Sequence, residues 1–339
     1  MSRDIKLLFT LNTFTILLPP SSLFQIPVLL RLRIQSLAVL ASVAEIPMDE
    51  SQIYEKVQEA YSAAVKCNNS EYGRKVAAAF GYSEQELAGT PDRANLGLSC
   101  GNPLALAKLR EGEIVVDLGS GAGFDVFLAA QKVGPRGKAI GVDMNKDMLE
   151  RAERNKGRAQ SDNVSFVESR ITTVALPDAI ADCIISNCVV NLVPEGQKQL
   201  VFNEMFRLLK TGGRVAISDI LTRKELSQEL KRDMALYVGC IAGASQVKQY
   251  EQYLQTVGFH EILIVDAHHD LNVYKMKGAE TSSHCCGTDA KNPCCEKSSS
   301  CCDNKTLEQG DAFESSRNSF ADLDFNEWAG SFKIYAVKA

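Results

Sequence analysis

The 339-residue chain lacks an excess of basic residues, because 37 lysines and arginines stand against 42 aspartates and glutamates and the formal net charge is −5. Nucleic-acid-binding proteins depend on a basic face, so no nucleic-acid partner is expected. The chain also lacks an internal repeat, and its first apolar run is too short to span a bilayer. With 45% hydrophobic and 23% charged residues, the composition is that of a soluble globular protein. We expect a monomer without stable membrane association.

A secreted disulfide scaffold is also excluded, although the chain has 11 cysteines. Such scaffolds are shorter and rarely pair neighbouring cysteines. Six of the cysteines form the adjacent pairs Cys285–Cys286, Cys294–Cys295 and Cys301–Cys302, and the other five are single: Cys67, Cys100, Cys183, Cys188 and Cys240. Reduced, reactive or soft-metal-binding thiols in a cytoplasmic protein fit this distribution better.

Changes in composition divide the chain into five regions. Residues 1–47 are apolar and basic and are expected to be a targeting segment, mitochondrial or membrane-directed, or a translation-start artefact with Met48 as the true start. Residues 48–112 predict a helical cap, and residues 113–277 predict the main domain. Residues 278–325, polar and rich in paired cysteines, are predicted to be disordered or loosely ordered. Residues 326–339 contain a final strand.

The main domain alternates strand-like and helix-like segments. The strand-like segments are EIVVDLG, KAIGVDM, NVSFVES, DCIISNC, GRVAISDI and EILIVDA. Their Val/Ile-rich, non-alternating character indicates a parallel sheet covered on both faces, and the alternation with helices predicts a doubly wound, Rossmann-like α/β sheet. The last segment, FKIYAVKA, is expected to return as a terminal antiparallel strand beside EILIVDA.

The segment VVDLGSGAGFD places a carboxylate, Asp117, at a strand end and three glycines in the following turn: Gly119, Gly121 and Gly123. Glycines are needed where backbone turns tightly and approaches a ligand. Their spacing is not the G-x-G-x-x-G of dinucleotide folds, so no pyrophosphate site is implied. The second strand ends in Asp143, whose carboxylate can accept both hydroxyls of a ribose, and Met144 next to it can cover an adenine.

This order of strand, D-x-G-x-G-x-G, helix, strand and Asp resembles the class I S-adenosylmethionine methyltransferases over residues 113–339. The resemblance implies S-adenosylmethionine as cofactor and a class I methyltransferase fold. The residues expected to hold the cofactor are Asp117, Gly119, Ser120, Gly121, Gly123, Asp143, Met144, Ile171 and Asn187. An NAD enzyme or a purely structural glycine turn is the alternative.

Three single cysteines fall in loops that should converge. Cys188 follows the strand DCIISN, Cys100 precedes the cofactor strand, and Cys240 follows the fifth strand. In a doubly wound sheet, ligands bind where such loops meet, at the carboxyl ends of the strands. Three thiols suit a soft, thiophilic atom. Trivalent arsenic takes three thiolates in a pyramid and keeps a lone pair that can attack a methyl sulfonium. Cys183, inside its strand, is expected to be a core residue.

The segments NLGLSCGNPLA, DLGSGAGFD, GVDMNKDML, SNCVVNLVPE and YVGCIAGA resemble the arsenite methyltransferases over residues 48–277. The resemblance implies arsenite and methylarsenite as substrates, with Cys188 and Cys240 holding arsenic and Cys100 as third thiolate. It also implies that Cys67 forms a disulfide with Cys100 during turnover, and that an external thiol reductant, glutathione or thioredoxin, is required. A single cysteine at 67 and the short tail at 278–325 depart from the family pattern.

Two other functions remain open at this stage. The chain could methylate an organic small molecule of sterol or quinone type, with the cysteines only lining a pocket. It could also be a non-enzymatic protein that binds arsenic or a metal through its paired cysteines.

Overall fold

The computed structural model describes residues 49–66, 70–91, 93–227, 230–231, 233, 236–237, 239–276 and 324–339. The expected leader, nearly all of the cysteine-rich tail with its three cysteine pairs, and Cys67 lie outside the described residues. The chain divides into two units, Met1–Asp49 and Glu50–Ala339. The following description concerns the second unit.

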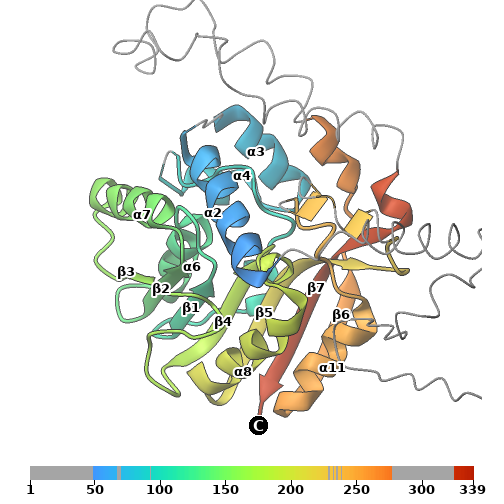
Figure 1. Cartoon of the computed structure of the whole chain (residues 1–339). Helices are drawn as coiled ribbons and strands as arrows, with labels where there is room; N and C mark the ends of the chain where they lie inside the picture. The colour runs from blue at the N-terminus through green and yellow to red at the C-terminus, as the bar shows by residue number, and fades with distance from the viewer. Residues whose placement is uncertain are drawn as a thin grey trace, which may run out of the picture. The chain divides into compact units, whose positions relative to one another are not determined.

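A seven-stranded sheet forms the centre of this unit, in the order β3-β2-β1-β4-β5-β7-β6 (Figure 1). The strands are β1 Ile114–Leu118, β2 Lys138–Asp143, β3 Val164–Glu168, β4 Ala181–Asn187, β5 Leu209–Thr222, β6 Phe259–Asp266 and β7 Ala329–Lys338. Strands β1 to β5 pair in parallel, whereas β7 is antiparallel to both β5 and β6. The predicted doubly wound sheet and its terminal antiparallel strand are therefore confirmed.

Helices cover both faces of the sheet. On one face, Val115 packs in a cluster with α5 (Leu104–Ala107) and α6 (Phe124–Val133). On the other face, its neighbour Val116 packs in a cluster with α8 (Lys198–Leu208) and α11 (Val247–Val257). Successive strand residues point to opposite faces, so each short run of Val and Ile supplies two cores. This explains why the strands read as continuous apolar runs rather than alternating ones.

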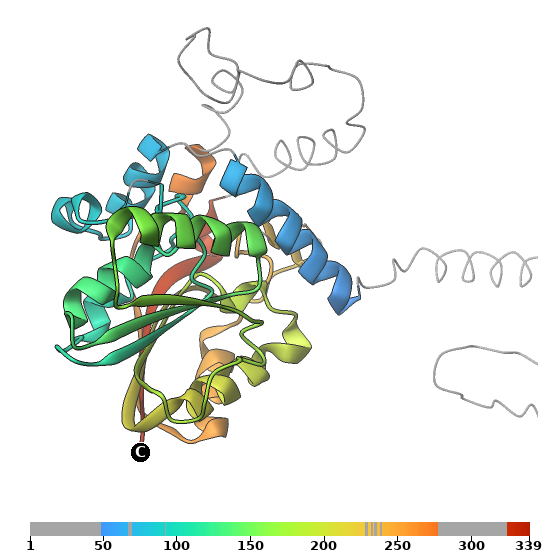
Figure 2. The same ribbon diagram turned by 90° about the vertical axis from the view of Figure 1, so that its left-hand side faces the viewer.

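A third hydrophobic cluster lies at the carboxyl ends of the strands. It joins Val57 of α2 (Glu50–Lys66), Val76 of α3 (Ser70–Ala79), and loop residues that include Cys100, Cys188 and Cys240. Figure 2 shows α2 beside α7 (Lys146–Ala159), which comes later in the chain and which α2 contacts. The cap therefore covers the edge of the sheet where ligands bind in doubly wound folds.

The remaining elements are short. They are α4 (Glu84–Ala88) and the 3-10 turns η2 (Val190–Leu192), η3 (Glu195–Gln197), η4 (Leu271–Met276) and η5 (Phe325–Glu327). Ser83 caps α4, since its hydroxyl accepts from the backbone N–H of Glu86 while the Glu86 carboxylate accepts from that of Ser83. Among the described residues, no helix is both long and apolar enough to cross a bilayer.

Candidate active site

A pocket opens between the carboxyl ends of β1, β2 and β4 and the inner side of α2. Its empty volume is about 1050 Å³, part of it open to solvent, which is in the range of small-molecule sites. Eight of the predicted cofactor residues line it: Asp117, Gly119, Ser120, Gly121, Asp143, Met144, Ile171 and Asn187. The ninth, Gly123, begins α6 with a φ of 91°, and a Cβ there would meet the rings of Phe166 and Phe127 at 2.8 and 2.9 Å.

The turn after β1 has the geometry that its glycines allow. Gly119 has a φ of 78°, and a Cβ at this position would lie 2.4 Å from the side chain of Val189. Only glycine lets β1 turn this close to the loop after β4. The buried hydroxyl of Ser120, in the same turn, has no hydrogen-bond partner within the described structure. It lines the pocket and can therefore bond a polar ligand atom.

Asp143 closes this turn from the side of β2. Its Oδ2 accepts the backbone N–H of Gly121 and its Oδ1 accepts that of Asn145, both at 2.8 Å. Burial raises the pKa of the carboxyl, and the hydrogen bonds from backbone N–H groups oppose that rise. Three backbone N–H groups, those of Gly121, Asn145 and Met144, bond the carboxylate, which leaves one of its four acceptor sites for a ligand hydroxyl. Asn145 also donates to the backbone oxygen of Gln58 on α2 at 3.1 Å, which ties the cap to the turn.

A buried group of polar side chains lies beside the glycine turn. The Tyr82 hydroxyl donates to Oδ1 of Asp125 at 2.6 Å, and Asn187 Nδ2 donates to Oδ2 at 2.9 Å. Burial raises the pKa of Asp125 to about 6, against the lowering effect of these two bonds. Burial, together with the charge of Asp125, raises the pKa of Asp117 well above its usual range. Sequence analysis missed Tyr82 and Asp125, since an acidic residue in the first turn of a helix is common.

Asn187 connects this polar group to the first cysteine. Its Oδ1 accepts the backbone N–H of Cys100 at 3.2 Å, and its Nδ2 lies 2.9 Å from the Gly101 oxygen. A Cβ at Gly101 would lie 2.6 Å from the Cβ of Ser218 on β5. The glycine after Cys100 thus lets the loop pack directly against β5, and Ser331 of β7 holds it there by donating to the Cys100 oxygen at 2.5 Å.

The three predicted substrate cysteines meet at this point. Cys100 and Cys188 form a disulfide with 5.6 Å between their Cα atoms, and Cys240 Sγ donates to the Cys188 oxygen at 3.0 Å. All three are at most 5% exposed, and Cys188 lines the pocket. Burial raises the pKa of the Cys240 thiol above its usual range. The expected partner of Cys100, Cys67, lies outside the described residues, and here Cys100 is joined to Cys188.

Two of these cysteines have an unusual backbone conformation. Cys188 and Cys240 both have left-handed backbones, with φ values of 60° and 64°. A non-glycine residue in this region is strained and is held there by its surroundings. For Cys188 the restraint is a bond from its N–H to the Ser218 oxygen at 2.9 Å. Cys183, in contrast, is buried inside β4 as predicted, and burial raises its pKa to about 12.

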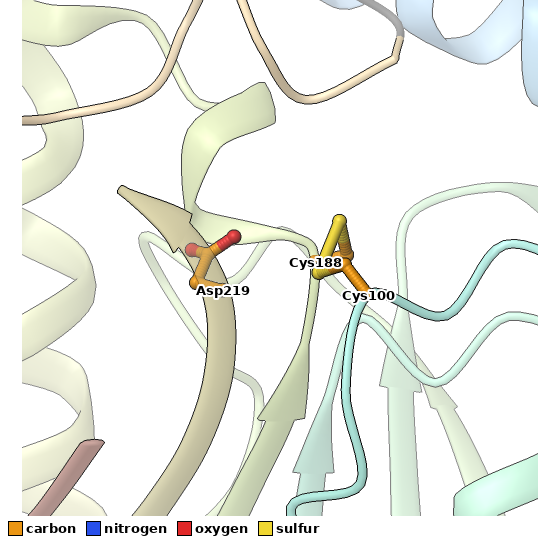
Figure 3. A group of neighbouring side chains, drawn as sticks. All are labelled: Cys100, Cys188 and Asp219. Atoms are coloured by element: carbon orange, nitrogen blue, oxygen red, sulfur yellow. A yellow bond between two sulfur atoms is a disulfide. The ribbon is translucent and has the colours of Figure 1, made fainter. Parts of the chain in front are cut away.

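One carboxylate beside the thiols was not predicted. Asp219 of β5 is fully buried, and Figure 3 shows one of its oxygens turned toward the cysteine pair. The two sulfur atoms and a carboxylate oxygen all lie within 4.8 Å of one another. Oδ1 accepts from Asn191 Nδ2 at 2.8 Å and from the Ile220 N–H at 3.0 Å. Burial raises the pKa of Asp219 to about 7. The available signal was an acidic residue inside the apolar strand GRVAISDI.

The sheet order and the glycine turn are those of the class I methyltransferase fold. A family model described as a methyltransferase domain matches residues 109–258. The structure of a putative sarcosine dimethylglycine methyltransferase from Galdieria sulphuraria aligns with a TM-score of 0.54 and 16% identity, covering 79% of this chain and 98% of that one. This likeness supports the fold alone.

Two sequence relatives are arsenite methyltransferases. The arsenite methyltransferase of Halobacterium salinarum is 46% identical over 184 residues, which are 54% of this chain and 46% of that protein. The arsenite methyltransferase of Homo sapiens is 36% identical over 154 residues, 43% of this chain and 40% of that protein. The chain is thus similar to arsenite methyltransferases over about half of its own length. The matches span less than half the length of these two relatives.

Proposed function

We propose that the protein is an arsenite methyltransferase that transfers the methyl group of S-adenosylmethionine to trivalent arsenic. The observation that carries the proposal is that three buried cysteines from distant segments share one cluster, with Cys188 at the wall of the pocket. A pocket for an organic substrate has no need of three thiols. A soft atom with a preference for sulfur does.

The cofactor fits the donors that face the pocket. Asp143 offers a carboxylate at the pocket wall, Ser120 offers a buried hydroxyl without a partner in the described structure, and Asp117 and Asp125 supply further carboxyl groups that face a cationic ligand. Asp143 would take a ribose hydroxyl, and Met144 and Ile171 would pack on the adenine. When bound, S-adenosylmethionine supplies an electrophilic methyl group on a sulfonium sulfur.

Arsenic binding requires reduced cysteines. The Cys100–Cys188 disulfide must first take two electrons and two protons from an external dithiol, or from two thiols, which become a disulfide. Arsenous acid then exchanges its three hydroxyl groups for the thiols of Cys100, Cys188 and Cys240, and the three thiol protons leave with them as three waters. The protein orients the arsenic lone pair toward the methyl group and excludes water.

Methylation forms an As–C bond while the methyl–sulfur bond breaks and its electron pair remains on S-adenosylhomocysteine. Arsenic is thereby formally oxidised from the trivalent to the pentavalent state. Two thiols can return it by giving up two electrons and becoming a disulfide, and glutathione or thioredoxin then reduces that disulfide. Cys67 is assigned as a partner of Cys100 in this step. We place the reaction in the cytoplasm, carried out by a monomer that acts on arsenite and methylarsenite.

Methyl transfer can be tested with purified protein, methyl-labelled S-adenosylmethionine and a thiol reductant. We expect label in arsenic products only when arsenite is present, with S-adenosylhomocysteine formed in equal amount. Cys188→Ser and Cys240→Ser should each abolish this transfer while cofactor binding is retained. If label instead enters a quinone or sterol and both variants behave as wild type, the protein is a methyltransferase for organic molecules. Stoichiometric arsenic binding without S-adenosylhomocysteine would indicate a scavenger.

A further inference from the structure

The buried carboxylate of Asp219 has no role in the proposed methyl transfer. It lies away from the cofactor pocket lining, at 0% exposure, and no ion pair with it forms among the described residues. The cation that acts on it electrostatically, Lys198, is engaged elsewhere, since its Nζ bonds the Glu195 carboxylate, the Gly243 oxygen and the Ser245 hydroxyl at 2.7, 2.5 and 2.9 Å. A buried acid without a cation costs stability, so its position beside two thiols needs an explanation.

The hydrogen bonds of this carboxylate are shorter on one oxygen than on the other. Oδ1 accepts two bonds, from Asn191 Nδ2 at 2.8 Å and the Ile220 N–H at 3.0 Å. Oδ2 accepts the Tyr250 hydroxyl at 3.3 Å, a long bond that a metal ligand bond can replace, and a backbone N–H of Asn191 also bonds the carboxylate. The sulfur atoms of Cys100 and Cys188 are within 4.8 Å of the carboxylate oxygen. Two sulfurs and one oxygen thus converge in a space closed to solvent.

We propose that reduction of the Cys100–Cys188 disulfide creates a site for one borderline-soft divalent cation such as Zn²⁺, with Cys100, Cys188 and Asp219 as its three protein ligands. This site goes beyond the proposed methyl transfer, although it shares two thiols with the arsenic site. A bound cation would keep the thiols reduced and would compete with arsenite for them.

Ligand chemistry separates the two sites. Trivalent arsenic holds three sulfurs and a lone pair, and a carboxylate adds nothing to that set. Zinc takes mixed sulfur and oxygen ligands at about 2.3 and 2.0–2.2 Å in a tetrahedron, which puts two sulfurs about 3.8 Å apart. The three donors already lie within the span of such a site. The fourth position is left to water, so Cys240 is required for arsenic and not for zinc.

Because zinc binding requires reduced thiols and releases protons, zinc affinity should depend on the reductant and on pH. A phosphine reductant takes the oxygen of water to become a phosphine oxide, and the disulfide gains two protons and two electrons as two thiols. Zinc then replaces both thiol protons, and also the proton of the Asp219 carboxyl where it is present. Two to three protons are therefore released for each zinc bound, and affinity should rise with pH.

The experiment uses the full chain with the six tail cysteines (285, 286, 294, 295, 301 and 302) replaced by serine, reduced with a phosphine that does not chelate zinc. Zinc affinity is measured by competition with a chromophoric chelator, and Co²⁺ is used as a spectroscopic probe for sulfur-to-metal charge-transfer bands. We expect one equivalent of metal, bound only after reduction. Asp219→Asn should weaken zinc binding at least tenfold and leave arsenite affinity within twofold of wild type.

Cys240→Ser is the matched control, since it should weaken arsenite binding at least tenfold and keep zinc binding within twofold. Cys188→Ser should lose the binding of both zinc and arsenite. S-adenosylhomocysteine binding and the thermal midpoint, measured for each variant, establish that it is folded. Absence of stoichiometric zinc in the reduced protein, or equal zinc affinity for wild type and folded Asp219→Asn, would overturn the proposal. Zinc binding that persists while no variant takes arsenite would overturn the proposed function and leave the zinc site standing.

Discussion

The two halves of the site are built in different ways. The half proposed to hold the cofactor comes mostly from one continuous stretch, in which β1, the glycine turn, α6 and β2 follow each other between Ile114 and Asp143. The thiol half collects Cys100, Cys188, Asp219 and Cys240 from four separate segments. In the first half the position of each group is set by its neighbours in the chain. In the second half it is set by the packing of the whole sheet and cap.

The restraints differ as well. Backbone hydrogen bonds and positive-φ glycines hold the cofactor half, and these do not depend on redox state. The thiol half is closed by the disulfide between Cys100 and Cys188, which a reductant opens. The comparison therefore predicts that changes in one half leave ligand binding in the other half intact. The following experiments test that independence, from the largest expected effect to the smallest.

The largest effect is expected for Cys188→Ser, which removes both a proposed arsenic ligand and the disulfide. Arsenite-dependent methyl transfer should fall more than about 100-fold, beyond the 10- to 100-fold typical of groups that only orient a ligand. Cofactor affinity, measured by calorimetry with S-adenosylhomocysteine, should stay within a few-fold of wild type. Cys183→Ala, a change in the same strand away from the site, serves as control for stability. A parallel loss of cofactor affinity would contradict the independence of the two halves.

A pH-dependent stability difference is expected for Asp219→Asn. The wild-type carboxyl has a folded pKa of about 7, above its unfolded value, so wild type loses stability as pH rises through 7, while the amide does not ionise. The variant should gain roughly 2–3 kcal/mol relative to wild type between pH 5 and pH 8.5. Urea unfolding at the two pH values, with the disulfide kept in one state, measures this. If the difference in free energy of unfolding between Asp219→Asn and wild type does not change with pH, another group compensates the charge of Asp219.

For the cofactor half, Asp143→Ala should weaken S-adenosylhomocysteine binding by about 10- to 100-fold, because at least one hydrogen bond to a charged acceptor is lost. Arsenite titration of the reduced protein should remain unchanged. Asp143→Asn, which keeps an acceptor for one of the two bonds from Gly121 and Asn145, should have the smaller effect. Equal cofactor affinity for wild type and Asp143→Ala would show that Asp143, at the end of β2, does not bind the ribose.

The smallest effect is expected for Cys67→Ser, which should slow methylation of inorganic arsenite a few-fold when reductant is limiting. Methylarsenite already carries one carbon ligand and needs only two thiolates, so its turnover should be unaffected. Rates for the two substrates, compared at low and high glutathione, measure the difference. If Cys67→Ser matches wild type on arsenite at low reductant, the thiols of Cys100 and Cys188 supply the two electrons by becoming the Cys100–Cys188 disulfide.

The same difference between the halves explains what could be predicted from the sequence. Glycine spacing, Asp117 and Asp143 form a local pattern with a physical reason for each residue, so the sequence predicts a cofactor site there, and Asp117, Gly119, Gly121 and Asp143 do line one pocket. That Cys100, Cys188 and Cys240 meet followed from the rule that loops converge at the carboxyl ends of parallel strands. Which two of them join did not follow, because disulfide pairing depends on distances that only the folded chain sets.

Asp219 and Asp125 show more clearly what cannot be predicted from the sequence. Each stands in a segment whose pattern already has an explanation, an apolar strand and a helix N-terminus, so neither called for a function. Their importance comes from partners far along the chain: Asn191 for Asp219, and Tyr82 and Asn187 for Asp125. Buried polar networks of this kind join residues that no local period connects.

The disulfide also changes the connectivity of the molecule. Its two cysteines are 88 positions apart, and the segment between them contains β1 to β4 with α6 and α7. In the oxidised state these elements form a closed covalent ring, which reduces the entropy of the unfolded chain and is worth roughly 4–5 kcal/mol by loop-closure estimates. A protease that cuts once inside the ring would leave a single covalent molecule until a reductant is added. The cell's thiol balance would then decide how readily the cofactor-binding strands are unfolded and degraded.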